Sequence, residues 1–557
     1  MGILSLEVEK GLYLGIDFGT TNSVVSIYHY DTNEVHTLKI DGYTVFPSVI
    51  QFEKDYDHGE LLRIFGIEAK EAAIIFPEST VTSVKRQLEI DEPIVIKVDE
   101  EEFTFESETI VSEILAHLKE QADVYIREQL NIVGTFSGCV ITVPANSTDK
   151  QKRKMKKAAV MAGFLEDHVY LRLEPAAAAI NYAVNVNEDK KVLVYDFGGG
   201  TFDACLLEII KQEEEPEISI LSTFGDNYLG GNDIDQLMVD IIYEEFLRLS
   251  NNEIDLFDFV KDDGMNEREK KMAIVRMKQM ATHTKEKLST SNSTKIVLAP
   301  FIQSPMIISI QLELTRDSFY KHKRQHQLDD AQEMFDKMKG LSVMDLVAKT
   351  ITCIDKCIRG ASLNKEQIDE VFLVGGSSSL VEVHTQIVEY FGKEPYKAKI
   401  SPALSISRGA AHYCNQIMLP TLKGPKVNER TIHSLGIEIA GRRYLEIIKK
   451  GLEIPEEGLV IEAPYTLETN FDELSSLAIV VYEDVEPDEY KRKFVYEEGI
   501  KRLAATSLRG IPARNKGEEK IKVIFKLSRD NTLTVEAIAL GSEEARTSLA
   551  VDDLYEK

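Results

Sequence analysis

The chain has 557 residues, 43% of them hydrophobic and 28% charged, a composition typical of a soluble globular protein that buries sizeable cores. Its formal net charge of −28 disfavours broad binding to nucleic acids or anionic membranes, because these partners are also negatively charged. Scattered cysteines without zinc or disulfide spacing, an N-terminus unlike a signal peptide and the lack of a bilayer-length apolar run favour a cytoplasmic protein with no membrane partner.

The first marked pattern is a strand, a turn and a second strand over residues 13–27. An apolar run enters Asp17-Phe-Gly19, a turn rich in glycine and threonine follows, and another apolar run leaves it. Such a turn is small enough for backbone N–H groups to approach an anion, as in other phosphate-binding nests. The Asp17 carboxylate at its entrance can face a metal ion or a water molecule.

From this hairpin to about residue 200, strand-like and helical stretches alternate. Strands are expected over 45–52 and 138–144, and helices over 110–126 and 149–162, with Asp149 as the candidate N-cap. Alternating strands and helices predict an α/β architecture.

The hairpin pattern then recurs over residues 192–209. Here the apolar run enters Asp196-Phe-Gly198, followed by two more glycines, Thr201 and a second apolar run. Two such hairpins facing each other would hold a polyphosphate and its cation from both sides. A P-loop is excluded because no segment matches its spacing, and a dinucleotide-binding fold is excluded because a strand follows the glycines where that fold has a helix.

The second half repeats the plan and then changes character. A long helix is expected over 267–288 and a strand over 371–374, while Cys353 and Cys357 are interpreted as small apolar residues. Prolines and glycine indicate a linker over 419–430. Beyond it, alternating apolar residues over 521–537 predict a small antiparallel β unit.

Several motifs together resemble the actin, sugar-kinase and heat-shock ATPase superfamily, and most closely the seventy-kilodalton heat-shock (DnaK-type) chaperones. The segments that carry the resemblance are Asp17-Phe-Gly-Thr-Thr-Asn-Ser23, Ile141-Thr-Val-Pro-Ala145, Glu174-Pro-Ala-Ala-Ala178, Asp196-Phe-Gly-Gly-Gly-Thr-Phe-Asp203, Leu229-Gly-Gly-Asn-Asp233, Leu373-Val-Gly-Gly-Ser377 and Ser434-Leu-Gly-Ile-Glu438. The resemblance implies an actin-like duplicated ATPase domain of two lobes over 1–418, the linker over 419–430, and a β-sandwich substrate-binding domain over 431–557.

The same resemblance implies roles for individual residues. Lys85 matches the lysine that orients the attacking water, Thr201 contacts the γ-phosphate, and Asp203 lies near the metal and the water. Glu174, with Pro144, matches a pair that relays the nucleotide state. Asp17 and Asp196 would hold a hydrated Mg²⁺. The positions that match ATP- or ADP-binding residues are Gly19, Thr20, Thr21, Asn22, Gly198, Gly199, Gly200, Thr201, Gly230, Gly231, Lys285, Ser289, Gly375, Gly376 and Ser377, and those that match the peptide groove are Ile437, Ile439, Leu467 and Ile479.

The chain departs from the family pattern in four places. Because it ends at Lys557, we expect the helical lid to be missing or vestigial, and Gly424-Pro-Lys-Val-Asn-Glu429 replaces the usual run of leucines in the linker. Tyr170 and Leu173 stand where an arginine and an asparagine usually precede the Glu-Pro motif, so the partner would be a dedicated J-domain cochaperone. Glu286 and Ser379 replace long side chains beside the adenine, which weakens the expected nucleotide binding.

We therefore expect an ATP-dependent molecular chaperone, a slow ATPase that binds extended apolar segments of unfolded polypeptides and works with a J-domain cochaperone and an exchange factor. The alternative is a non-cycling adaptor that keeps nucleotide bound and docks one dedicated partner through its β domain. A small-molecule kinase on the same fold is disfavoured, because a peptide-groove domain has no use in such an enzyme.

Overall fold

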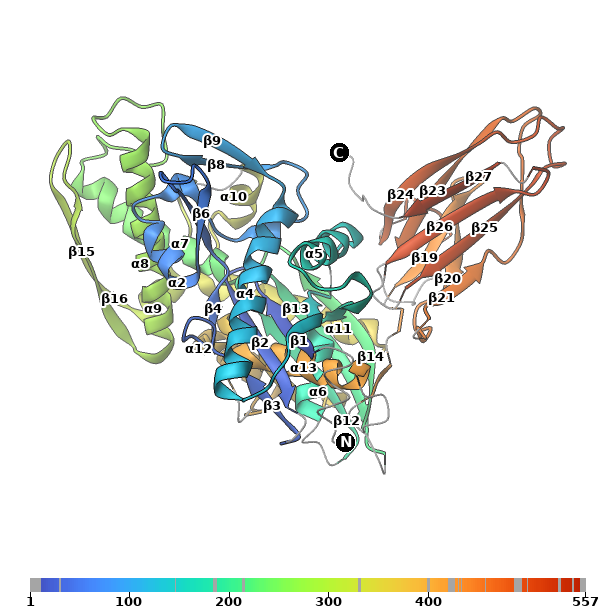
Figure 1. Cartoon of the computed structure of the whole chain (residues 1–557), viewed down its shortest axis with the longest axis horizontal. Coiled ribbons are helices and arrows are strands. Elements are labelled where there is room, and N and C mark those ends of the chain that lie inside the picture. The colour runs from blue at the N-terminus through green and yellow to red at the C-terminus, as the bar shows by residue number, and fades with distance from the viewer. Residues whose placement is uncertain are drawn as a thin grey trace.

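The computed structural model describes residues 12–550, apart from 30–31, 146, 184–187, 213–215, 329–331, 398–400, 419–425, 429, 432, 456, 485–492, 498, 529–531 and 543–544. Helices and strands alternate through most of the chain, and the C-terminal part contains strands (Figure 1). The mixed α/β content expected from the sequence is confirmed.

The first sheet is built around the N-terminal hairpin. Its strand order is β11-β10-β1-β2-β3, and β4 pairs with β2. The hairpin pair β1–β2 is antiparallel, whereas β10 lies parallel to both β1 and β11. The strands are β1 (Leu12–Phe18), β2 (Asn22–His29), β3 (Glu34–Thr37), β4 (Phe46–Pro47), β10 (Phe136–Val143) and β11 (Val169–Leu173).

Among the described residues, two small sheets and five helices lie between the strands of the first sheet in the sequence or directly after its last strand. The strands are β5 (Ile50–Lys54), β6 (Leu61–Phe65), β7 (Thr80–Val81), β8 (Ile94–Val98) and β9 (Glu101–Phe105). The helices are α2 (Gly66–Ala72), α3 (Val84–Gln87), α4 (Ser107–Gln129), α5 (Asp149–Met161) and α6 (Glu174–Ala183). The buried apolar residues of α4 pack with those of β1 and β10 in one core, so the hairpin is anchored below its turn.

The second sheet repeats the arrangement of the first. Its order is β17-β12-β13-β14-β18, with an antiparallel hairpin β12–β13 and β17 parallel to β12. The strands are β12 (Lys190–Phe197), β13 (Phe202–Ile210), β14 (Glu217–Asp226), β17 (Glu370–Val374) and β18 (Lys426–Asn428). In each sheet the first strand of the hairpin has a parallel partner, β10 for β1 and β17 for β12. Both strands of such a pair end at the same edge of the sheet, so the loops that follow them start close together.

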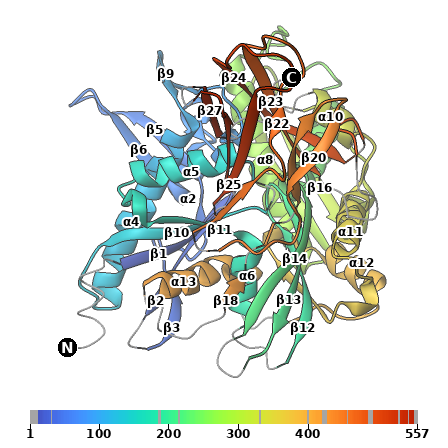
Figure 2. The same ribbon diagram turned by 90° about the vertical axis from the view of Figure 1, so that its right-hand side faces the viewer.

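A separate apolar core joins the second sheet to the elements that follow it. These elements are α7 (Gly231–Leu249), α8 (Glu267–Thr290), β15 (Ser293–Ile302), β16 (Ile308–Thr315), α9 (Arg316–Lys321), α10 (Gln332–Met338), α11 (Val343–Gly360) and α12 (Val381–Phe391). They precede α13 (Ser405–Met418), whose buried apolar residues belong to the core of the first sheet. Helix α13 returns to the first sheet, where it packs against β1 and α6 (Figure 2).

The C-terminal part forms two antiparallel sheets that share one apolar core. One sheet contains β19 (Ser434–Ile439), β20 (Arg443–Ile448), β23 (Ser476–Asp484) and β24 (Ile500–Arg509). The other contains β21 (Leu459–Glu462), β22 (Leu467–Glu468), β25 (Lys520–Leu527), β26 (Leu533–Ala539) and β27 (Arg546–Ala550). Ile437 of β19, Val481 of β23, Val523 of β25 and Val535 of β26 belong to this core.

The segment expected to be a linker contributes a strand to the second sheet. Residues 419–425 and 429 of that segment lie outside the described residues. Strand β18 pairs in parallel with β14, and Val427, with 2% exposure, is buried at this edge. A second contact follows, because Lys450 Nζ donates to the Gly360 carbonyl at 2.8 Å and so ties the C-terminal region to the end of α11.

Two local expectations are wrong. The strand expected over 45–52 is interrupted, because β4 pairs with β2 while β5 joins a different sheet. Between them, Ser48 turns toward the first hairpin: its N–H donates to the Thr21 carbonyl at 3.0 Å and its hydroxyl to the Gly19 carbonyl at 2.8 Å. The N-cap of α5 is Thr148 and not Asp149, because Thr148 forms a capping box with Gln151.

The cysteines behave as the sequence predicts. All five are free and buried, and Cys357 Sγ contacts the carbonyl of Ala204 at 3.4 Å. Among the described residues, no helix is both long enough and apolar enough to span a bilayer.

Helices α6 and α13 approach each other so closely that only a glycine fits at the contact. A Cβ atom at Gly409 would lie 1.7 Å from the Ala177 carbonyl oxygen, a backbone atom that cannot move aside cheaply. We expect Gly409→Ala to lower the free energy of unfolding by about 1–3 kcal/mol, measured by urea denaturation without nucleotide. Gly376→Ala is the matched control, because its added methyl meets no atom within 4 Å. Equal stabilities of the two variants would contradict the packing explanation.

Candidate phosphate and metal site

The first hairpin turn is held in shape by its own backbone and by Ser48. Gly19 is needed because a Cβ atom there would lie 2.2 Å from the Asn22 carbonyl oxygen. The two hydrogen bonds from Ser48 reach the Gly19 and Thr21 carbonyls, which leaves the hydroxyls of Thr20 and Thr21 directed elsewhere. Ser48 therefore holds the backbone of the turn, and the threonine side chains lie against Gly199 and Gly200 of the second hairpin.

The second turn is fixed by the start of α7. Gly198 N–H donates to the Thr201 carbonyl at 3.1 Å, and the N–H groups of Gly231 and Asn232 donate to the carbonyls of Gly198 and Gly199 at 3.0 and 2.8 Å. Glycine is required at Gly230, because a Cβ atom there would lie 2.5 Å from the Gly199 carbonyl oxygen. The motif of residues 229–233 thus packs directly on the second turn.

The two turns meet face to face. A Cβ atom at Gly199 would lie 2.3 Å from Thr21 Oγ1, and one at Gly200 would lie 2.8 Å from Thr20 Oγ1. Thr21 Oγ1 also donates to Asn232 Oδ1 at 3.4 Å. The structure therefore brings together the two turns that the sequence singled out.

Four carboxyl groups gather below the turns around one lysine. Asp17 and Asp196 are the second-last residues of β1 and β12, Asp203 is the second residue of β13, and Glu174 begins α6. Lys85 Nζ forms an ion pair with Glu174 Oε1 at 2.8 Å, and both side chains are largely buried. This arrangement follows from the two sheets, whose central strands end at the same edge.

The electrostatics of this cluster are unfavourable without a cation. Burial, with the nearby Glu174 charge, raises the pKa of Asp17 to about 7 and that of Asp203 to about 8. The same two causes raise the pKa of Asp196 well above its usual range. The Lys85 ammonium lowers all three pKa values but does not offset the burial of so many carboxyl groups.

The donor set fits a hydrated magnesium ion. Asp196 Oδ2 is buried and has no hydrogen-bond partner among the described residues. Mg²⁺ prefers oxygen ligands and keeps several waters, so it needs only one or two carboxylates from the protein. Buried carboxylates facing glycine-rich turns match the chemistry of a cation that bridges protein and polyphosphate.

Arg86 and Asp233 belong to the site, although the sequence reasoning did not select them. Arg86 Nη2 donates to the Gly200 carbonyl at 2.6 Å and lies 3.9 Å from Asp233 Oδ2. Burial raises the pKa of Asp233 to about 6, while Arg86 and the Gly230 N–H, 2.7 Å away, oppose the rise. Their positions beside Lys85 and inside the 229–233 motif are the signals that could have identified them.

Some of the other residues predicted to bind the nucleotide contact the second turn or Asp196, whereas Ser289 does not show such a contact. Lys285 Nζ lies 3.0 Å from the Gly231 carbonyl oxygen and 2.9 Å from Asp235 Oδ1. Ser377 Oγ donates to the Gly198 carbonyl at 2.8 Å. Gly375 has a φ of 80°, and a Cβ atom there would lie 2.6 Å from Asp196 Oδ1. By contrast, Ser289 donates to the Lys285 carbonyl within its own helix.

The four residues expected to line a peptide groove lie at different depths. Ile437 and Ile479, exposed by 1% and 3%, belong to the core between the C-terminal sheets, whereas Ile439 and Leu467 are partly buried at its margin. Burial of Ile437 and Ile479 is explained by packing alone. A client-binding role for these four residues stays a prediction.

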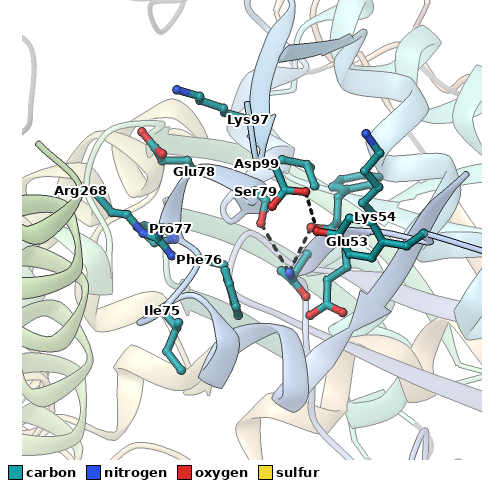
Figure 3. Close-up of a pocket in the computed structure, with 14 residues that line it drawn as sticks. Glu53, Lys54, Ile75, Phe76, Pro77, Glu78, Ser79, Lys97, Asp99 and Arg268 are labelled. Carbon is teal, nitrogen blue, oxygen red and sulfur yellow. Dashed lines mark hydrogen bonds between the residues drawn. The ribbon is translucent and has the colours of Figure 1, made fainter. Parts of the chain in front are cut away.

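Contacts also cross from α8 to helix α2 and to the short 3-10 turn Pro77–Ser79 of the first half. Lys271 Nζ forms an ion pair with Glu78 Oε1 at 2.8 Å, and Gln279 Nε2 donates to the Lys70 carbonyl at 2.6 Å. A cavity of about 270 Å³ lies beside this contact, lined among others by Phe76, Glu78 and Arg268 (Figure 3). Its lining includes none of the residues predicted to bind nucleotide.

The site thus has the chemistry of proteins that bind a polyphosphate together with a divalent cation. A family model described as Hsp70 protein matches residues 13–553. The chain is 32% identical over 543 residues to the Chaperone protein DnaK of Thermotoga petrophila, covering 96% of this chain and 79% of the relative. It is 31% identical over 553 residues to the Chaperone protein DnaK of Thermosipho melanesiensis, with coverages of 97% and 80%.

The chain therefore belongs to the Hsp70 family, whose members are ATP-binding chaperones with ATPase activity. The family resemblance seen in the sequence is confirmed.

The raised pKa values predict how stability depends on pH without ligand. In the folded chain Asp17 and Asp203 keep their protons up to about pH 7 and 8, whereas in the unfolded chain they release them near their usual pKa of about 4. Between pH 5 and 8 the folded state therefore binds more protons, so the free energy of unfolding falls as pH rises, by up to about 1.4 kcal/mol per unit for each carboxyl. Urea denaturation in EDTA across this range measures the slope.

Asp203→Asn provides the control for this slope. It removes one titrating group with little change of shape, so the decline with pH should become shallower than in the unchanged protein. A slope that is the same in both proteins would show that the cluster does not cause the pH dependence.

Proposed function

We propose that this protein is an ATP-dependent chaperone that hydrolyses Mg·ATP slowly and uses the nucleotide to control binding of extended apolar polypeptide segments. The observation that supports the proposal is the Lys85–Glu174 ion pair among buried carboxyl groups, directly below two facing phosphate-type turns. Membership of the Hsp70 family supports the same conclusion independently.

In this proposal the chain's residues would bind the metal–nucleotide and orient the attacking water. Asp17 and Asp196 would hold a hydrated Mg²⁺, and the two turns with Thr20, Thr21 and Thr201 would donate hydrogen bonds to the phosphates. Lys85, held by Glu174, orients the attacking water, and Asp203 accepts a hydrogen bond from it. The metal–nucleotide supplies charge neutralisation and a leaving group, and little further covalent chemistry is needed from the protein.

The second sheet offers a physical route from the site to the C-terminal sheets. Thr201 leads into β13, β13 pairs with β14, and β14 pairs with β18, which continues toward β19. The charge of Lys152 in α5 also acts on Glu483 of β23. Burial disfavours the Glu483 carboxylate, but the charges of His433, Lys501 and Lys152 lower its pKa overall, which is a second link between the N-terminal half and the C-terminal sheets. The Lys450–Gly360 hydrogen bond adds a third link.

The non-cycling adaptor has no support in the family comparisons, which point to chaperones. The expectation of a dedicated J-domain cochaperone also belongs to this proposal. Arg172, two residues after Tyr170, where the family pattern has an arginine, is buried and lies over the rings of Tyr170 and Tyr413 at 6.0 and 5.3 Å. Its guanidinium is therefore packed within the chain, which supports a changed recognition surface.

Hydrolysis in single-turnover conditions tests the proposal. We expect Lys85→Ala to lower the rate of Mg·ATP hydrolysis by about 100-fold or more, because one preorganised charge at the reacting water is lost. Bound nucleotide, measured separately by fluorescence, should remain. Lys295→Ala is the matched control, since it removes a lysine from an exposed ion pair with Glu313.

Either of two results would contradict the proposal. Lys85→Ala could hydrolyse ATP as fast as the Lys295→Ala control, or the unchanged protein could bind ATP without ever cleaving it. The second result would return the adaptor to consideration.

The role of β18 can be tested at Val427. Val427→Ser removes apolar burial worth about 1–2 kcal/mol, which corresponds to roughly a tenfold shift away from the β14–β18 pairing. We expect ATP to accelerate release of a fluorescent apolar peptide less in this variant, while hydrolysis persists. Val133→Ser, at a position 81% exposed, is the control. Unchanged acceleration in Val427→Ser would show that β18 does not transmit the signal.

A further inference from the structure

Two carboxylates of α7 and two histidines of the loop after α9 form a group that includes none of the residues assigned to the phosphate and metal site. Asp240 and Glu244 are one helical turn apart on α7, so they share a face of the helix. His322 follows the last residue of α9, and His326 lies a few residues further along the same loop. The loop thus presents two imidazole rings to the carboxylates of the helix.

The side chains are close enough to share one ion. His322 Nε2 lies 2.8 Å from Asp240 Oδ2. One donor atom from each of Asp240, Glu244 and His322 lies within 4.8 Å of the other two. His326 Nε2 is 3.8 Å from Glu244 Oε1, which adds a second imidazole beside the group.

The group is also held in place. Asp240 is completely buried, and its carboxylate accepts the backbone N–H groups of Gln325 and His326 at 3.0 and 2.8 Å. The His326 ring packs edge-on against Tyr243, with centroids 5.5 Å apart and planes at 89°. Backbone hydrogen bonds and ring packing therefore fix both the carboxylate and the loop before any ion arrives.

We propose that Asp240, Glu244 and His322, assisted by His326, form a binding site for a divalent transition-metal ion of the Zn²⁺ type. Imidazole nitrogens and carboxylate oxygens are ligands that Zn²⁺ accepts, whereas Mg²⁺ and Ca²⁺ prefer oxygen alone. The ion would take the place of the hydrogen between His322 Nε2 and Asp240 Oδ2, and the neutral imidazole would then carry its hydrogen on Nδ1.

The position gives the site a structural consequence. Helix α7 begins at Gly231, whose N–H donates to Gly198 in the second phosphate-type turn. An ion would join the middle of this helix to the loop after α9. A cavity of about 510 Å³ beside the group, lined among others by Tyr243, Asp255 and His326, gives solvent access to the His326 side.

The competing explanation is a hydrogen-bonded cap. In that explanation three hydrogen bonds alone hold Asp240, with His322 as one donor, and Glu244 is a half-buried acid that binds no ion. This explanation predicts no saturable binding of a metal ion, so a titration separates it from the proposal.

The experiment is a Co²⁺ titration of the full chain after chelator treatment, without nucleotide, followed by visible absorption, with Zn²⁺ then added as competitor. We expect saturation at one ion in this site and displacement by Zn²⁺. His322→Ala and Glu244→Ala should each weaken binding by at least about tenfold. Asp240 is left unchanged, because its backbone hydrogen bonds also shape the loop.

His384→Ala is the matched control. His384 Nε2 also lies 2.8 Å from a carboxylate, Glu394 Oε2, but this exposed pair belongs to no three-membered group among the described residues. The control should keep the Co²⁺ spectrum that His322→Ala loses, with both variants folded by circular dichroism. Absence of saturable binding, or full binding in His322→Ala, would overturn the proposal.

Discussion

The Lys85 ammonium and the carboxyl groups around it impose the constraint on which the rest of the site depends. One buried cation faces Glu174, Asp17, Asp196 and Asp203, and burial together with the Glu174 charge raises the pKa of the three aspartates. A cluster with too few cations is costly in a folded protein unless something else supplies positive charge. The same imbalance that costs stability therefore prepares the cluster for a cation and its phosphates.

The duplicated sheet explains why these groups meet. Asp17 and Asp196 each lie one residue before the end of the first strand of a hairpin, and in each sheet a parallel strand ends at the same edge. The parallel strand beside Asp196 leads to Gly375, where only glycine leaves room for the carboxylate. A side chain at the end of one strand is thus positioned by the ends of its neighbours, and the glycines are required by close approach.

The sequence was sufficient for the features that repeat or alternate. Matching hairpins, the helix that became α8 and the period-2 strands β25 and β26 could all be predicted from local patterns, and so could Lys85 and Asp203 through the family resemblance. Features set by contacts between distant segments could not. The break between β4 and β5 arises from hydrogen bonds of Ser48 to the first turn, and Arg86 joins the site through a carbonyl of the second turn. The histidines of α9's loop meet α7 only in three dimensions.

The altered linker shows how backbone geometry can preserve a connection when side chains change. The run of leucines expected from the family is absent, yet β18 still adds to the edge of the second sheet and buries Val427. Main-chain hydrogen bonds to an exposed sheet edge place few demands on sequence, and alternate side chains supply the remaining specificity. In β18 these side-chain contacts are the burial of Val427 and the hydrogen bond from Asn428 to Glu217. Because β14 also pairs with the strand that follows Thr201, a continuous set of paired strands joins the second hairpin to the strand of the linker.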